Sequence, residues 1–197
     1  MLVAIVFAAF LLISPRTITF AQSQGARGTP CVSTFSADLA KAPPQSLEAF
    51  IKQSDLIADA VVESVFPSNR VGGPLSTDSV LRVTRVFKGS DKTQRFVVGQ
   101  LGGQMDGRKE YTCSYPGILM APGQRYLLFL TEENPRFPSR FLVRENLHRY
   151  VIQSTFAGLV LLDGNKTQTS PDMPFRSKYE GMDPALFISD IEMYLRP

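Results

Sequence analysis

The stretch VLRVTRVFKG (residues 80–89), with FVVGQLGGQMDG (residues 96–107) and PGQRYLLFL (residues 122–130) after it, decides the fold. β-Branched and aromatic residues fill each segment, and glycines separate one segment from the next. Short apolar runs bounded by turn residues are typical of β-strands. The block therefore predicts a twisted, mostly antiparallel β domain.

The alternation of apolar and polar residues breaks once inside the first of these strands. Leu81 and Val83 share a face, but the next apolar residue, Val86, falls out of phase with them. A β-bulge at Thr84 and Arg85 would return Val86 to the side of Val83. Because bulges curl a sheet toward closure, we expect these strands to form the wall of a barrel.

The rest of the chain supplies further strands and two helices. Ser46 is placed to cap a short helix, and Asp183 with Pro184 to begin a longer one near the C-terminus. The apolar face expected for the longer helix comprises Leu186, Phe187, Ile191, Tyr194 and Leu195. The additional strand candidates are residues 56–66, 141–143, 150–152, 159–162 and 167–169. The sequence predicts a mainly β fold, a partly closed antiparallel barrel with a short N-terminal helix and a C-terminal amphipathic helix. Its strand motifs resemble those of OB-like barrels.

The N-terminus has the layout of a secretory signal. Residues 2–13 form an unbroken apolar run, which Ser14 and Pro15 end. The run is shorter than the roughly 20 residues of a membrane span, and Ala21 is a small residue suited to cleavage. We expect residues 1–21 to be a signal peptide, residues 22–45 a polar strap and residues 46–197 a single domain, secreted or periplasmic. An anchor formed by an uncleaved N-terminal segment is the alternative.

Two cysteines are present, Cys31 and Cys113. An even number of cysteines in an exported chain is typical of disulfide bonding. We therefore expect one disulfide that ties the strap to the β domain, and two unpaired buried thiols are the alternative. Because the closed loop is long, the chain-entropy treatment gives the disulfide a stabilisation of about 4 kcal/mol.

Patterns of catalysis and metal binding are missing from the sequence. The 21 basic residues exceed the 18 acidic ones only slightly, so we do not expect nucleic acid as a partner. His148 is the only histidine of the chain, which falls far short of a zinc ligand set. The glycine-rich residues 102–107 lack the lysine of a phosphate-binding loop. We therefore expect a protein that is not an enzyme and has no cofactor or metal.

The best candidate for a binding site is the segment of residues 136–150, in which positive charge and aromatic rings alternate. Guanidinium groups hold anions through paired hydrogen bonds, and aromatic rings can stack beside them. OB-type barrels commonly bind oligosaccharides or oligonucleotides, and an exported protein meets anionic glycans. An edge strand whose arginines discourage aggregation is the alternative interpretation. The candidate residues are Arg136, Phe137, Arg140, Phe141, Arg144, Arg149 and Tyr150.

The strand motifs, taken in order, resemble a known type of module. They are SDLI-A-A-VV from Ser54, V-RVTRVFKG from Val80, GGQMDG from Gly102 and PGQRYLLFL from Pro122. Over residues 54–162 they resemble a group of exported bacterial proteins whose barrel is similar to that of the netrin-like and tissue-inhibitor-of-metalloproteinase families. In those inhibitors the N-terminal cysteine binds the zinc of the target. The resemblance implies that role for Cys31 only if Cys31 becomes the first residue of the mature chain, whereas cleavage after Ala21 leaves a polar extension before it.

These features give one leading function and two alternatives. The leading function is that of an exported, non-enzymatic binding or interaction module, with an anionic glycan or a protein as its partner. The first alternative is an inhibitor of an extracellular metalloprotease. The second is a hydrolase that uses carboxylates or serines.

Overall fold

The computed structural model of the chain describes residues 43–67, 76–90, 92, 94–101, 103–105, 108–110, 119–132, 147–154 and 157–196. Its helices are α1 (Leu47–Gln53), α2 (Arg176–Tyr179) and α3 (Pro184–Leu195). Its strands are β1 (Leu56–Val65), β2 (Ser76–Lys88), β3 (Arg95–Leu101), β4 (Gly103–Met105), β5 (Arg108–Glu110), β6 (Arg125–Glu132), β7 (Arg149–Ile152), β8 (Leu159–Asp163) and β9 (Lys166–Thr169). Strand outweighs helix, so the predicted mainly β fold is confirmed.

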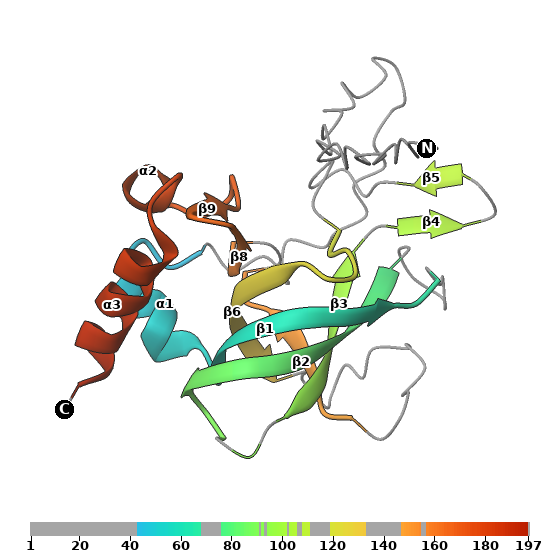
Figure 1. Cartoon of the computed structure of the whole chain (residues 1–197), viewed down its shortest axis with the longest axis horizontal. Helices are drawn as coiled ribbons and strands as arrows, with labels where there is room; N and C mark the ends of the chain where they lie inside the picture. Colours follow the sequence, from blue (N-terminus) through green and yellow to red (C-terminus); the bar gives the residue numbers. More distant parts are fainter. Residues whose placement is uncertain are drawn as a thin grey trace, which may run out of the picture.

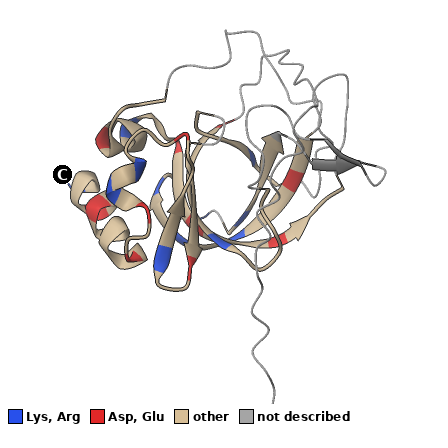
Figure 2. Ribbon diagram, turned by 90° about the horizontal axis from the view of Figure 1, so that it is seen from above, with Lys and Arg blue, Asp and Glu red and all other residues tan. Residues whose placement is uncertain are grey.

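Five of the strands close into a barrel, which Figure 2 shows from above. β1 pairs with β2, β2 with β3, β3 with β7 and β7 with β6, and β6 pairs back to β1. The β3–β7 pair is parallel, and the other pairs of this ring are antiparallel. The predicted OB-like barrel is thus confirmed, but it is closed where we expected it partly closed, because β6 bonds to β1 along six register positions.

The predicted bulge in β2 is present. Asp59 is the register partner of Arg85 and Ala60 that of Val83, so Thr84 is the extra residue of β2. As a result, Val83 and Val86 both pack against the same interior cluster. The bulge adds local twist, which helps β2 follow the curved wall.

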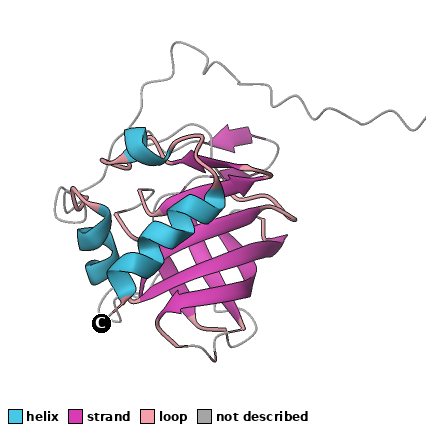
Figure 3. Ribbon diagram, turned by 60° about the vertical axis from the view of Figure 1, so that its left-hand side comes forward, coloured by secondary structure: helices cyan, strands magenta, loops and turns pink. Residues whose placement is uncertain are grey.

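Two hydrophobic cores lie on opposite sides of the barrel wall. The interior core takes alternate residues from all five barrel strands and from β8, for example Leu128 and Phe96. The second core lies outside the wall, where Ile57, Leu127 and Phe129 pack against helices α1, α2 and α3. β6 is therefore apolar on both faces, and Figure 1 and Figure 3 show the helices gathered on one side of the barrel.

Local sequence sets the ends of the two main helices, as predicted. The Ser46 side chain accepts a hydrogen bond from the backbone of Ala49 at the start of α1, and that of Asp183 accepts one at the start of α3. At the other end of α1, the ammonium of Lys88 donates to the carbonyl oxygens of Ile51 (2.7 Å) and Lys52 (3.0 Å). A cation at a helix C-terminus is favourable, so Lys88 fastens α1 to β2.

The apolar face predicted for α3 is only partly correct. Phe187 and Ile191 are fully buried in the second core, whereas Leu186 and Tyr194 are exposed. Leu195, one turn beyond Ile191, is partly buried against the same core. A helix of this kind can bury only the residues that recur every third or fourth position.

The glycine-rich stretch of residues 102–107, which the sequence indicates as a loop, contributes β4 to a separate two-stranded sheet with β5. Figure 1 shows this sheet standing away from the helices. None of the helices in the described ranges is long and apolar enough to cross a membrane.

Candidate anion-binding face

A row of arginines crosses the part of the barrel wall that the helices leave uncovered. Arg82 of β2 is the register partner of Arg95 of β3 and of Val61 of β1, and Val61 is also the partner of Arg125 of β6. These residues therefore lie side by side on four neighbouring strands. Neighbouring strands are about 4.8 Å apart, so the arginine row (Arg82, Arg95 and Arg125) spans about 14 Å along the wall.

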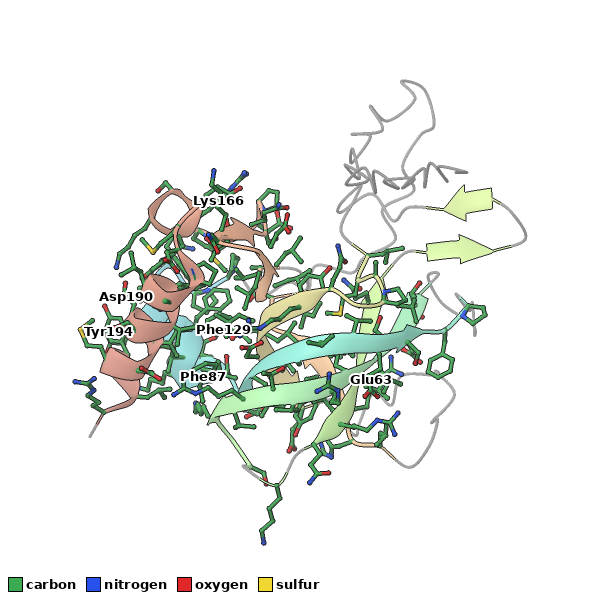
Figure 4. All side chains as sticks on the ribbon, in the orientation of Figure 1. Glu63, Phe87, Phe129, Lys166, Asp190 and Tyr194 are labelled. Carbon is green, nitrogen blue, oxygen red and sulfur yellow. The ribbon has the colours of Figure 1, made fainter. Side chains whose placement is uncertain are left out.

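Strand alternation turns the arginine row outward. Leu81, Phe96 and Tyr126, which are chain neighbours of the three arginines, are fully buried in the interior core. Successive side chains of a strand point to opposite faces, so the row lies on the outer surface. Figure 4 labels Glu63 beside this part of the sheet, at the far end of β1 from the helices, and Phe129 on the helix side.

The row presents positive charge to solvent. The side chains of Arg82, Arg95 and Arg125 are 57%, 43% and 49% exposed, and that of Arg85, farther along β2, is 54% exposed. The carboxylates that pair with them are all less exposed than the arginines. A ligand therefore meets more guanidinium surface than carboxylate surface on this face, although the arginines are paired with carboxylates.

Asp59 is the fixed counterion of the row. Its side chain is 2% exposed, and its two carboxylate oxygens accept hydrogen bonds from Nε and Nη2 of Arg125. This side-on pair leaves the Nη1 edge of the guanidinium pointing away from Asp59. The hydrogen bond from Arg125 to Asp59 raises the pKa of Arg125, so this arginine stays charged at any ordinary pH.

Glu63 bridges the other two arginines of the row. Its Oε1 lies 3.3 Å from Nε of Arg82, and its Oε2 accepts a hydrogen bond of 2.8 Å from Nε of Arg95. Val62 pairs with Leu81 and Ser64 with Val80, so Glu63 is an extra residue at another of the three irregularities of the β1–β2 ladder. The bulge aims this carboxylate at the arginines on β2 and β3.

Arg85 joins the row to the helical side of the molecule. Its guanidinium forms an ion pair with Glu192 of α3 and lies over the ring of Phe87, 4.7 Å from the centroid. The partly buried ring of Phe87 also packs against the second core. Arg85 therefore marks the border between the open surface and the surface that α3 covers.

Two of the sequence-predicted binding residues are described, and both are held inside the fold. Tyr150 is buried in the interior core, where its ring meets that of Phe96 edge to face at 5.5 Å. The Arg149 side chain is 12% exposed and forms a two-pronged ion pair with Asp78, with contacts of 2.9 and 3.1 Å. A Cβ on Gly99 would lie 2.1 Å from this guanidinium, so the absence of a side chain there makes room for Arg149.

The other predicted binding residues lie outside the described residues: Arg136, Phe137, Arg140, Phe141 and Arg144. So do Cys31, Cys113, the expected signal peptide and nearly all of the expected strap. The binding segment, the disulfide and the zinc-binding role of Cys31 all stay predictions.

His148 is exposed, with Nε2 3.6 Å from a carboxylate oxygen of Glu132. Its ring lies against that of Tyr150, with centroids 4.6 Å apart. Within the described ranges, no group of three or more His, Cys, Asp and Glu side chains is placed to hold a metal ion.

The sequence alone does not show that the three arginines of the row lie close together. Arg82, Arg95 and Arg125 stand next to apolar strand residues in three separate segments, and each by itself is an ordinary surface residue. They meet only because the β1–β2, β2–β3 and β1–β6 registers align them. Chemically, three guanidinium groups in line can hold an anion with repeated charges, through charge-assisted hydrogen bonds.

No protein-family model matches this chain, and a search of curated proteins finds no significant match.

Proposed function

We propose that this protein is an exported, non-enzymatic binding module that holds a linear anionic polymer, most naturally an anionic glycan, on its arginine row. The observation that carries the proposal is the alignment of Arg82, Arg95 and Arg125 on adjoining strands with about half of each side chain exposed. The signal-like N-terminus supports an extracellular or periplasmic ligand, and glycans are the common polyanions there.

The shape of the row favours an extended ligand over a small one. A phosphate or sulfate ion reaches one or two guanidinium groups, whereas the row runs for about 14 Å. A polymer that lies across the strands would meet Arg125, Arg82 and Arg95 in turn, with Arg85 beside its path. Each guanidinium can give a forked pair of hydrogen bonds to a sulfate or carboxylate.

The anionic partner also fits the way the basic face is built. The row is rigid because it rests on closed barrel strands, so little conformational entropy is lost when a ligand binds. Asp59 holds the guanidinium group of Arg125 in place before the ligand arrives. Preorganised arginines bind more tightly than the same side chains on a loop.

Binding of dextran sulfate by calorimetry tests the proposal. Each lost charge-assisted hydrogen bond is worth about 1.5 kcal/mol, so we expect Arg82→Gln/Arg95→Gln to weaken binding at least about tenfold. The affinity should also fall with salt, and less steeply for the variant, because fewer counterions are released.

The matched control is Arg176→Gln/Arg196→Gln, which removes the same two positive charges from the helical side of the molecule. Arg176 opens α2 and Arg196 follows α3, whereas the three arginines of the row lie on barrel strands. This control should bind as the unaltered chain does. Equal losses in the two double variants would show that only net charge matters, and the proposal would be rejected.

A further inference from the structure

Glu63 differs from Asp59 in a way that bears on which polymers the row accepts. Asp59 is almost completely buried, so no ligand can take its place beside Arg125. The Glu63 side chain is 29% exposed and is shared between Arg82 and Arg95, which are both open to solvent. An exposed carboxylate of this kind can leave its partners at small cost, because water and a ligand anion replace the contact.

We infer that Glu63 is an internal counterion which a densely charged polymer displaces from Arg82 and Arg95 and a sparsely charged polymer does not. This inference rests on the proposed function of the row. With Glu63 in place, its carboxylate offsets one of the two positive charges of Arg82 and Arg95. A ligand gains from this pair only if it brings enough negative charge to replace the carboxylate.

The contact geometry supports exchange of one anion for another. Glu63 reaches both guanidinium groups at Nε, at 3.3 Å and 2.8 Å, and it is the only carboxylate that bridges two arginines of the row among the described residues. Its two oxygens are spaced like two oxygens of a sulfate group. A sulfate at this point would meet the same nitrogens and would leave Glu63 to turn into solvent.

A densely charged chain has such a group at every position along the row. A polymer with widely spaced carboxylates would pair with Arg125 and then place a neutral stretch beside Arg82 and Arg95, where Glu63 already satisfies the charge. The difference between the two kinds of polymer should therefore depend on Glu63. It should widen when the carboxylate is replaced by an amide of the same shape, because only the densely charged polymer has to break the Glu63 contacts.

The experiment compares two polymers with three forms of the full chain. The polymers are dextran sulfate, which is densely charged, and carboxymethyl dextran of low substitution, which carries widely spaced carboxylates on the same backbone. The forms are the unaltered chain, Glu63→Gln and Glu132→Gln. Glu132 is an exposed residue at the opposite end of β6 from Arg125, and the strand registers place it about 14 Å from Arg95, so this control removes the same charge beyond the Debye length of about 8 Å.

We expect Glu63→Gln to strengthen dextran sulfate binding about fivefold, the upper range for an exposed ion pair, because that polymer no longer has to break the Glu63 contacts. Binding of the sparsely substituted carboxymethyl dextran should rise by less than about twofold, since it leaves Glu63 in place. Glu132→Gln should change neither affinity by as much as twofold at physiological salt, because charges that far away are screened.

The failure of this inference and that of the proposed function give different results. If Glu63→Gln raises both affinities equally, or no more than Glu132→Gln does, the displacement by ligand is wrong while the binding role of the row still stands. If the unaltered chain does not bind dextran sulfate, or if Arg82→Gln/Arg95→Gln binds it undiminished, the proposed function itself is overturned and the role of Glu63 with it.

Discussion

The outward-facing side chains of β1 and β6 are buried beneath helices in one stretch of these strands and left uncovered in another. Near the helices their outward residues are Ile57, Leu127 and Phe129, which are all fully buried beneath α1 and α3. Farther along, the outward residues are Val61, Glu63 and Arg125, and no described helix covers them. The barrel interior continues unchanged behind both stretches.

The difference teaches that one sheet can serve stability and recognition at the same time. On the helix-covered face, burial of apolar side chains drives the helices onto the wall. On the open face, ion pairs fix the direction of arginines but contribute little to stability, because exposed pairs are worth 1 kcal/mol or less. Substitutions on the two faces should therefore separate loss of folding from loss of binding.

The largest effect is expected on the helix-covered face, from Phe129→Ala. The Phe129 ring is fully buried and meets Phe50 edge to face at 5.6 Å and Phe187 at 6.4 Å. Removal of a buried phenyl ring leaves a cavity and costs about 3–5 kcal/mol. Urea denaturation should show this loss. Leu186→Ala, on the exposed side of α3, is the control and should change stability by about 0.5 kcal/mol or less.

A smaller effect on the same side of the molecule is expected from acid. Burial alone would raise the pKa of Glu180, but hydrogen bonds from the side chain and backbone of Thr169, and the pairing with Arg176, lower it overall from 4.5. A carboxylate whose pKa is lowered by folding stabilises the fold above its ordinary pKa and loses that contribution as pH falls through the folded value.

Thermal unfolding as a function of pH measures this contribution. The unaltered chain should lose stability below about pH 4.5, and Glu180→Gln should be less stable at neutral pH with a shallower decline in acid. The change should remain well below that of Phe129→Ala, since Glu180 is a partly exposed group. An equally steep decline in the variant would show that other carboxylates cause the acid sensitivity.

The smallest effect on stability is expected on the open face. Arg82→Gln/Arg95→Gln removes two exposed side chains and leaves the buried parts of the wall intact, so the free energy of unfolding should change by about 0.5 kcal/mol. The same variant is expected to lose most of its affinity for dextran sulfate. A large loss of stability would mean that the arginine row is structural, and the contrast between the two faces would disappear.

The sequence was a good guide wherever side-chain pattern alone decides the structure. Val83 and Val86 indicated the bulge, and Ser46 and Asp183 the helix starts, because these features depend on neighbours in the chain. The beginning of β2 was missed: Ser76 and Thr77 carry no apolar signal, and they are in a strand because they pair with the end of β3. Backbone pairing, not hydrophobicity, extends β2 to that point.

The arginine row could not be predicted for the same reason. Its members come together through three strand registers, and a shift of one residue in any register would turn an arginine away from the others. Arg149 shows the reverse case. It looked like a surface residue in a basic segment, but the parallel pairing of β3 with β7 brings it to Asp78. The role of a side chain that contacts a neighbouring strand can be inferred only when the pairing of the strands is known.

The most direct test of the central claim is an NMR titration of the arginine Nε–Hε signals with dextran sulfate. If the open face is the binding surface, the largest shifts will fall on Arg82, Arg95 and Arg125, with small ones on Arg176 and Arg196. Largest shifts on Arg136, Arg140 and Arg144 instead would place the ligand on the segment suggested by sequence and would contradict the role of the arginine row.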